Sequence, residues 1–415
     1  MKIDLKQPSM RITATLFAGQ SFTSAAIIAI GTVLTIVATQ LSGDPAKAGL
    51  PTAFASLAAA PASFVWGILW DRIGRRKGLA IGVLFGAVGM VVAIIAFQIQ
   101  SFVLFVFAYI GIGFSRSAML LGRFIAAEVN PPNKRGQAIS YVVFGGTVGA
   151  VLGPLLVSPS AKIAIKLGMD ELAGPFLIAI FIFLIAAIII YFGLNPEPKT
   201  IGEQIDLEYP EEEIASGKVR TFPELLKNPG VIVAVTSMII GQAVMTLVMG
   251  MTALFMRDNG HNLADISIVF SAHTLGMFAF SVLTGNLADR WGRPQVIITG
   301  SMILLASFVL APLSLTTSMI ALALFLLGLG WNFSFVAGSA LLADILNHAE
   351  RSKSQGANDL LIALSAAGAS FGGGVVYANY GFPSLNGIGA FLTLIPLILT
   401  LWWSLVYQKR IKNRI

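Results

Sequence analysis

Long apolar stretches alternate with short polar turns along nearly the whole chain. A helix needs roughly 20 apolar residues to cross a bilayer core of about 30 Å. Twelve stretches approach or exceed that length, so we predict membrane-spanning helices at residues 14–40, 50–70, 78–98, 102–127, 136–157, 174–193, 230–256, 264–288, 294–314, 318–345, 354–379 and 384–408. The pattern therefore predicts an all-α, multi-pass protein of the cytoplasmic membrane.

The composition strengthens this prediction. Hydrophobic residues make up 56% of the 415 positions and charged residues only 11%, which is outside the range of soluble proteins. The 42 glycines suit helices that pack closely in lipid. The chain has no cysteine, which excludes disulfides, thiolate metal sites and cysteine nucleophiles. The first apolar stretch is too long for a signal peptide, so we expect no cleaved leader.

The net charge of +7 is explained by topology. If the N-terminus is cytoplasmic, the cytoplasmic loops and both termini hold 21 of the 27 lysines and arginines, and the opposite side holds Lys47, Lys162, Lys166 and Arg257. Lysine and arginine accumulate in the cytoplasmic loops of membrane proteins. We therefore predict that both termini are cytoplasmic, and we expect no nucleic-acid partner.

A charged turn occurs twice, about 218 residues apart. The first copy reads Gly-Ile-Leu-Trp-Asp-Arg-Ile-Gly-Arg-Arg-Lys at residues 67–77, and the second reads Gly-Asn-Leu-Ala-Asp-Arg-Trp-Gly-Arg-Pro at residues 285–294. Further features recur at nearly the same offset: Glu128 matches Asp344, and Gly111-x-Gly113 matches Gly328-x-Gly330. This repetition indicates a duplicated membrane protein.

The repeat predicts two six-helix halves arranged in parallel, as in many secondary transporters. We expect an N-terminal bundle at residues 1–194, a cytoplasmic linker at 195–228 and a C-terminal bundle at 229–415. The linker contains three consecutive glutamates at residues 211–213. An acidic run of this kind is typical of a solvated, flexible segment, with a docking site for a partner as the alternative.

The repeated turn, with its pattern Gly-x-x-x-Asp-Arg-x-Gly-Arg, resembles the signature of the major facilitator superfamily in both of its expected places. The resemblance covers the whole chain and points to a bacterial, 12-helix, drug- or metabolite-efflux-like branch. It implies two pseudo-symmetric six-helix bundles and transport by alternating access. The stretch Gly149 to Pro154 resembles the drug/proton antiporter motif, but Val157 and Ser158 replace the paired glycines that follow it there. The substrate is not implied by the resemblance.

The same resemblance implies a conformational latch at the cytoplasmic end of each half. An aspartate can favour the dipole of a helix N-terminus, and an arginine can bridge to a carboxylate on a neighbouring helix. In the first latch the turn would join Glu128, and in the second Asp344 would receive Arg290 or Arg293. Both latches would stabilise the outward-facing state. The alternative is that these residues only anchor the turns. The turn residues concerned are Asp71, Arg72, Arg75, Asp289, Arg290 and Arg293.

Two arginines lie inside a predicted span. Arg116 lies 12 residues before Glu128, which is about 18 Å along a helix, and Arg123 lies seven residues later. An arginine within the membrane almost always faces a partner or a water-filled cavity. No acidic residue lies near the middle of any span, so a substrate anion is an attractive partner for Arg116. The alternatives are a structural role for Arg116, and a gate pair between Arg123 and Asp359.

Other polar residues occupy spans that line the cavity in this superfamily or lie beside it. We consider Gln242, Thr246, Trp331 and Asn332 as substrate contacts, with hydrogen bonding between helices as the alternative. His273 is the only histidine within a span. Histidine titrates near physiological pH, so it is a candidate for proton coupling, and a packing role is the alternative.

These features predict a secondary active transporter that moves a small organic solute, with an anion or zwitterion favoured over a cation. The alternative is a proton-coupled multidrug-type efflux protein that uses His273. A receptor or scaffold is disfavoured because no stretch is long enough for a signalling domain. We expect no enzyme activity, cofactor or metal site, since the chain lacks a phosphate-binding loop and a metal-spaced His/Glu cluster. The expected partners are the substrate, the lipid bilayer and, in the coupled alternative, protons, and the expected state is a monomer.

Overall fold

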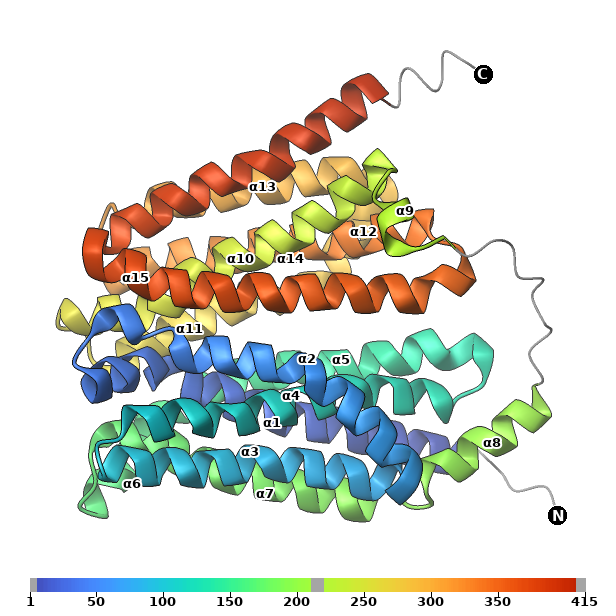
Figure 1. Ribbon diagram of the computed structural model, residues 1–415, viewed down its shortest axis with the longest axis horizontal. Helices are drawn as coiled ribbons and strands as arrows, with labels where there is room; N and C mark the ends of the chain where they lie inside the picture. Colours follow the sequence, from blue (N-terminus) through green and yellow to red (C-terminus); the bar gives the residue numbers. More distant parts are fainter. Residues whose placement is uncertain (1–5, 210–219, 408–415) are drawn as a thin grey trace. The chain divides into compact units, whose positions relative to one another are not determined.

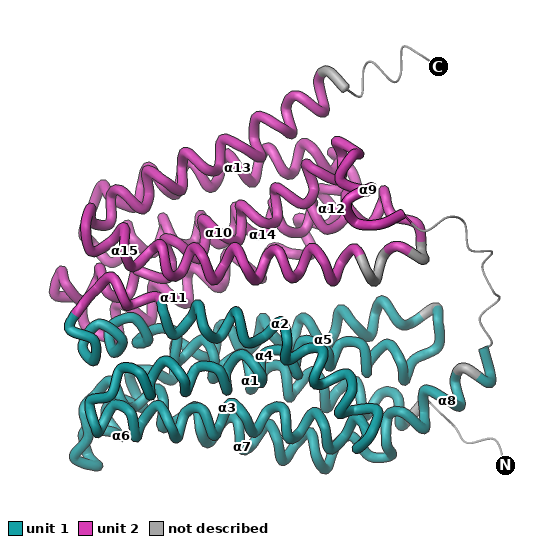
Figure 2. The backbone as a smooth tube through the Cα atoms, in the orientation of Figure 1, with its two compact units in different colours: residues 1–43, 50–214 teal, residues 44–49, 215–415 magenta. Residues whose placement is uncertain are grey.

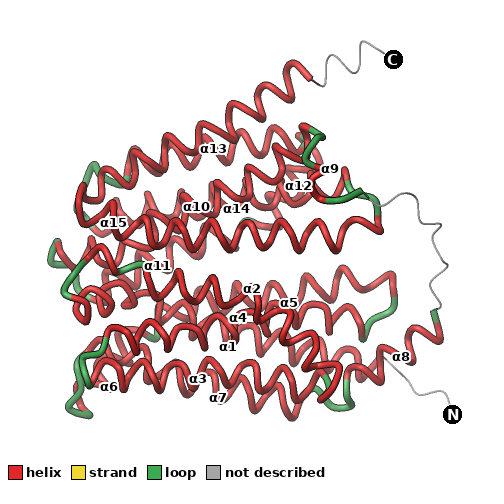
Figure 3. The backbone as a smooth tube through the Cα atoms, viewed as in Figure 1, coloured by secondary structure: helices red, strands yellow, loops and turns green. Residues whose placement is uncertain are grey.

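A computed structural model describes residues 6–209 and 220–407 (Figure 1). Contacts divide the chain into two compact units, residues 1–43 with 50–214, and residues 44–49 with 215–415 (Figure 2). The turn at 44–49 belongs to the second unit, where Ser370 Oγ donates a hydrogen bond to the Gly49 carbonyl at 2.9 Å. Every regular element in the described ranges is a helix, and short loops join the helices (Figure 3).

The described part of the first unit contains eight α-helices. They are α1 (Lys6–Ser42), α2 (Leu50–Ile73), α3 (Arg75–Gln98), α4 (Phe102–Glu128), α5 (Arg135–Leu155), α6 (Val157–Lys166), α7 (Gly174–Gly193) and α8 (Pro198–Glu208). The second unit contains α9 (Phe222–Leu225), α10 (Pro229–Asp258), α11 (Leu263–Phe278), α12 (Ser281–Trp291), α13 (Arg293–Leu310), α14 (Thr317–Ile345) and α15 (His348–Trp402).

The predicted spans are confirmed as helices. Eleven helical segments in the described ranges are long and apolar enough to cross a bilayer. The last of them, Ser354–Leu405, contains two predicted spans, because α15 is kinked at Gly381, whose φ is 74°. A glycine adopts this left-handed conformation without the steric cost of a Cβ atom. The all-α, 12-span fold is therefore the one that the sequence predicts.

Many large apolar side chains point away from the packed interior. Phe64 is 73% exposed, Phe181 60% and Phe391 69%, and similar residues recur along several spans. Apolar surface of this extent does not occur on a soluble monomer, and it is the surface that lipid tails would cover. This exposure agrees with a multi-pass membrane protein.

Glycines allow the closest approaches between helices. A Cβ atom on Gly149 of α5 would lie 2.0 Å from the Ser21 carbonyl oxygen of α1. A Cβ atom on Gly328 of α14 would lie 2.2 Å from the His273 carbonyl oxygen of α11. Small residues are typical of such interfaces in membranes. Two glycines that stand out in the sequence thus fix the α1–α5 and α11–α14 packing.

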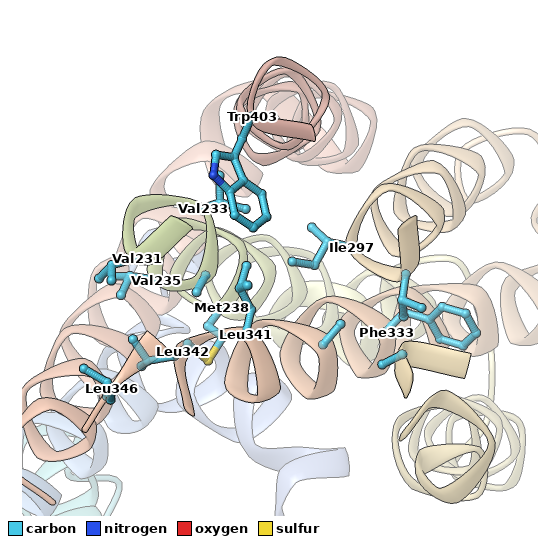
Figure 4. Packing of buried hydrophobic residues seen from close by; sticks show 14 of the residues in the cluster. Val231, Val233, Val235, Met238, Ile297, Phe333, Leu341, Leu342, Leu346 and Trp403 are labelled. Atoms are coloured by element: carbon cyan, nitrogen blue, oxygen red, sulfur yellow. The ribbon is translucent and has the colours of Figure 1, made fainter. Parts of the chain in front are cut away.

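A buried apolar cluster holds the second unit together near its predicted cytoplasmic end (Figure 4). It combines Met238 of α10, Ile297 of α13, Leu341 of α14 and Trp403, and each of these is less than a tenth exposed. The cluster fixes α14 against α10 and α13. Because α14 carries both Trp331 and Asp344, this packing sets the positions of two predicted functional residues.

The structure departs from the predicted elements in three places. Span five ends at Leu155, and the short helix α6 follows, because Pro154 has no N–H group to continue the hydrogen-bond ladder. Span eight is broken into α11 and α12 by a turn at residues 279–280. The linker, expected to be flexible, contains α8, whose Ile201 and Ile205 are 3% and 1% exposed. The acidic run at 211–213 lies outside the described residues.

Candidate functional site

Arg75 forms ion pairs with the two acids of the predicted first latch, and the conformational role of these ion pairs stays a prediction. Gly74 links α2 to α3 with a φ of 89° and thereby places Arg75 at the start of α3. The guanidinium donates from Nη1 to Asp71 Oδ1 at 2.8 Å and from Nε to Glu128 Oε2 at 3.3 Å. The Arg75 side chain is 20% exposed. One arginine therefore ties the turn to the end of α4.

The second unit repeats this arrangement with an aspartate in place of the glutamate. Gly292 has a φ of 98° and precedes Arg293, the first residue of α13. Arg293 donates from Nη1 to Asp289 Oδ1 at 2.5 Å and from Nε to Asp344 Oδ2 at 3.2 Å. The sequence left open whether Arg290 or Arg293 meets Asp344, and the structure shows Arg293 in that place.

Arg72 and Arg290 were predicted as latch members, but the structure places them elsewhere. Both side chains are exposed, and neither makes an ion pair within the ranges that the structure describes. The reason is the geometry of the turn. Asp71 lies near the end of α2 and Arg75 is the first residue of α3, so the turn at Gly74 brings the two side chains together. Arg72 lies about 100° around α2 from Asp71 and therefore points elsewhere. The latch in each unit is thus one arginine between two acids.

Sequence reasoning missed an additional acid at the first latch. Glu197, which precedes α8, accepts hydrogen bonds through Oε1 from the backbone N–H groups of Arg75 at 2.5 Å and Arg76 at 3.3 Å. A carboxylate is favoured at a helix N-terminus by the exposed N–H groups and the dipole. The available signal was Pro198 at the first helical position, followed by apolar residues four apart.

A second unforeseen ion pair connects the linker to α15. Arg220 donates from Nε to Glu350 Oε1 at 2.8 Å and from Nη2 to Oε2 at 2.9 Å, and its backbone N–H also reaches Oε1 at 3.0 Å. Glu350 is 1% exposed. The hydrogen bonds from Arg220 lower the pKa of Glu350 to about 2. This pair fixes the start of α15 and the preceding loop, next to Asp344.

The two arginines of span four have different surroundings. Arg116 is exposed on the surface of its own unit and makes no hydrogen bond within the described part of the chain. Leu120 and Phe124, four and eight residues later, are 49% and 51% exposed and continue the same stripe of α4. Arg123 is half-buried, and its guanidinium carbon lies 5.0 Å from the centre of the Phe124 ring. Arg116 is therefore the more accessible cation.

Three of the predicted substrate contacts lie together in the second unit. Gln242 of α10 donates from Nε2 to Thr246 Oγ1 at 3.0 Å and accepts from Trp331 Nε1 of α14 at 3.1 Å. The Trp331 ring stacks on Phe335 with centroids 4.8 Å apart and meets Phe278 edge-on at 6.3 Å. All five side chains are partly exposed. We call these five residues the aromatic–amide cluster.

His273 and Asn332 are buried instead. His273 is 2% exposed, and its Nδ1 lies 2.9 Å from the Leu324 carbonyl oxygen. Asn332 is 0% exposed, and its amide bonds Met277 O, Ser281 Oγ and Thr284 Oγ1 beside the break in span eight. These placements give both residues packing roles in the described conformation. Their expected contacts with substrate or proton stay predictions.

Comparisons with known proteins agree with these features. The sequence model of the Major Facilitator Superfamily matches residues 16–255 and 237–414. The uncharacterised MFS-type transporter YdeG of Bacillus subtilis is 35% identical over 92% of this chain and 89% of its own. The riboflavin transporter RfnT of Brucella anthropi is 31% identical over 88% of this chain and 89% of its own. More distant relatives include multidrug resistance efflux pumps.

Solved structures show the same fold. A bacterial homologue of the human lysosomal transporter Spinster, in an inward-facing and unoccupied conformation, aligns with a TM-score of 0.68. The alignment covers 95% of each chain at 15% sequence identity. At that identity the likeness concerns the fold alone.

Proposed function

Because the chain belongs to the major facilitator superfamily of membrane transporters, we propose that it carries a small organic anion or zwitterion across the cytoplasmic membrane by alternating access. The observation that carries this proposal is Arg116. It is the fifteenth of the 27 residues of α4, so it lies near the middle of a span. Within the described part of the chain it has no hydrogen-bond partner.

Arg116 would be costly in hydrocarbon. A charged side chain near the bilayer centre faces a partner or a water-filled path in almost all membrane proteins. The exposed stripe of α4 that carries Arg116 therefore lines such a path in our proposal. A carboxylate, phosphate or sulfonate of the solute would pair with the guanidinium through two parallel hydrogen bonds. This pairing would neutralise the arginine while the solute crosses the membrane.

A specific observation favours a second candidate substrate, a neutral planar heterocycle. The aromatic–amide cluster offers the face of Trp331, an aromatic neighbour on either side and the free capacity of the Gln242 amide. Aromatic rings stack on such surfaces, while a polar handle fixes their orientation. The relative RfnT is a riboflavin transporter, and riboflavin has the required planar ring system.

The latch residues support the mechanism of alternating access. In our proposal, the Arg75 and Arg293 bridges hold the cytoplasmic ends of spans two, three and four, and of spans eight, nine and ten, in one arrangement. They must rearrange when the cytoplasmic side opens. Each bridge is partly exposed, so each contributes about 1 kcal/mol or less. Bridges of this strength would bias a two-state equilibrium without locking it.

Ligand-induced thermal stabilisation of the purified full-length protein tests the substrate class. Binding to the native state raises the unfolding temperature by mass action. Organic anions and zwitterions should stabilise the wild-type protein, and Arg116→Gln should remove that effect without changing the unfolding temperature of the unliganded protein. Arg290→Gln is the matched control, because Arg290 is an exposed arginine outside the described ion pairs.

Two outcomes would contradict the anion proposal. The first is stabilisation by anions that persists in Arg116→Gln, and the second is stabilisation of the wild-type protein by organic cations alone. Riboflavin belongs in the same screen. If riboflavin stabilises the protein and Trp331→Leu removes that effect while Arg116→Gln does not, the heterocycle is the better candidate.

A further inference from the structure

The first unit contains a pocket that the predicted site does not use. Its volume is about 720 Å³, and its walls come from the start of α1, the α4–α5 loop with the start of α5, and the end of α8. Asn130 in the pocket wall lies 14 residues after Arg116 and just beyond the end of α4. At the rise of a helix, this separation corresponds to about 21 Å along the helix axis. Pockets of this size suit drug-sized ligands. The pocket lies at the predicted cytoplasmic end of the unit.

Hydrogen bonds between the walls give the pocket a fixed shape. Asn130 Nδ2 donates to Thr13 Oγ1 of α1 at 3.1 Å and to the Ala126 carbonyl oxygen of α4 at 2.8 Å. On α5, Gln137 Nε2 donates to the Tyr141 hydroxyl at 3.2 Å. The third wall is held by Ile205 of α8, which is 1% exposed. Asn130, Thr13 and Ile205 in the pocket wall are therefore held in place by their own contacts.

The pocket carries two opposite charges over an apolar floor. Lys134 and Glu208 both line it, both are exposed, and neither is paired within the described ranges. Glu208 is the last residue of α8, where the helix dipole is also negative. That corner therefore attracts a cation twice over. Phe17, Ala138 and Ile205 also line the pocket and supply an apolar surface, which we call the floor.

We propose that this pocket is a cytoplasmic subsite for the transported solute, and that the solute is an amphipathic zwitterion. Its carboxylate would lie against Lys134, its ammonium group against Glu208 and the end of α8, and its apolar body on the floor. This inference rests on the proposed transport function and narrows its substrate class from anion or zwitterion to zwitterion. A phosphatidylethanolamine headgroup presents the same pair of charges, so the experiment must separate a lipid from a solute.

Three small molecules with one shared body test the charge pattern. Phenylalanine, phenylacetate and phenethylamine carry a zwitterionic, an anionic and a cationic group on closely similar phenyl-bearing chains. Their affinities for the purified full-length protein are measured by calorimetric titration. We expect phenylalanine to bind about five- to ten-fold more tightly than either analogue, as expected for one additional charged contact at a partly exposed site.

Substitutions then assign each charge. Lys134→Gln should lower the affinity for phenylalanine to that for phenethylamine, and Glu208→Gln should lower it to that for phenylacetate. Lys162→Gln and Glu203→Gln are matched controls, because both residues are exposed and neither lines the pocket. If the wild-type protein shows no preference for phenylalanine, or if both pocket variants keep that preference, the proposal is wrong.

Two further comparisons separate this proposal from its neighbours. Reconstitution into vesicles with and without phosphatidylethanolamine identifies a lipid site, since an effect of Lys134→Gln that requires this lipid would overturn the solute proposal. Arg116→Gln tests the transport site independently. If Arg116→Gln loses anion binding but retains the preference for phenylalanine, the result supports the subsite as a site separate from Arg116. If Arg116→Gln also abolishes the preference for phenylalanine, that preference arises at Arg116 and only the subsite proposal is wrong.

Discussion

Replacing Asn332 by leucine should destabilise the protein, because Asn332 supports the break in span eight. Its Nδ2 donates to the Met277 carbonyl oxygen at 2.6 Å and to Ser281 Oγ at 2.8 Å, and its Oδ1 accepts from Thr284 Oγ1 at 2.6 Å. The break separates α11 from α12 at residues 279–280. Leucine has a similar volume but forms none of these hydrogen bonds.

The size of the effect follows from the three hydrogen bonds. Hydrogen bonds between membrane helices contribute about 0.6 kcal/mol each on average, which gives about 2 kcal/mol for three. The Met277 carbonyl would lose this bond while buried, at a further cost of about 1–3 kcal/mol. The two hydroxyls are protected, because Ser281 Oγ also donates to Phe278 O and Thr284 Oγ1 to Phe280 O. We expect a loss of roughly 3–5 kcal/mol.

Thermal unfolding of the purified protein, followed by tryptophan fluorescence, measures this loss. A decrease in the unfolding temperature of roughly 3–6 °C is expected for a chain of this length. Ser281→Ala is the control, since it removes one bond and leaves Met277 O paired, and it should cost about 1 kcal/mol or less. If Asn332→Leu unfolds at the wild-type temperature but loses transport, the structural assignment is wrong and Asn332 contacts the substrate.

Three other perturbations test separate parts of the structure. Arg75→Gln and Arg293→Gln should each shift the equilibrium toward the inward-open state about two- to five-fold. Since the chain has no cysteine, the labelling rate of a single cysteine introduced at Gln137 reports the shift. An unchanged labelling rate would argue against the latch. The pKa of Glu350 is lowered from 4.5 to about 2. The stabilising effect of the ionised carboxylate is therefore complete above pH 4.5 and is lost as the pH falls toward 2. Between pH 6 and pH 3 the unfolding temperature should fall more steeply in the wild type than in Glu350→Gln, and parallel curves would contradict the stabilising role of the Arg220–Glu350 ion pair. Gly328→Ala should destabilise the protein by at least about 2 kcal/mol, because the added Cβ would lie 2.2 Å from the His273 carbonyl oxygen. Gly356→Ala is the control, because the space around Gly356 is open. Equal unfolding temperatures for the two variants would refute the packing argument.

The sequence alone predicted the spans and most residues of the Arg75 and Arg293 ion pairs, because both rest on strong, local signals. The role of these ion pairs as latches stays a prediction. Apolar runs of span length have few alternative structures. The turn motifs place Asp71 four residues before Arg75, and Asp289 four before Arg293, and the short glycine turn within each motif brings the pair together. The acids at the ends of spans four and ten were found through the repeat.

The remaining features depend on packing that a single sequence does not reveal. Glu197 meets the start of α3 across 122 residues and Arg220 meets Glu350 across 130, and no periodic pattern links such partners. Trp331 and Asn332 are neighbours at the same depth in span ten. Rotation by about 100° per residue places Trp331 in the aromatic–amide cluster and turns Asn332 toward the break in span eight. Span eight contains no proline, so its sequence gives no signal for the break at residues 279–280.

The two repeats agree at their ends and differ at their centres. Arg75 and Arg293 each bond two acids through Nη1 and Nε, an aspartate and a glutamate in the first repeat and two aspartates in the second. At mid-span, the sequence offset of about 217 residues makes Phe333, which is 6% exposed, the repeat equivalent of Arg116. By the same offset, Phe114 is the repeat equivalent of Trp331. Residues that support the same movement in both halves require the same geometry in each half. A part that recognises an asymmetric solute requires different chemistry from each half, and this contrast favours Arg116 and the aromatic–amide cluster as the residues that choose the substrate.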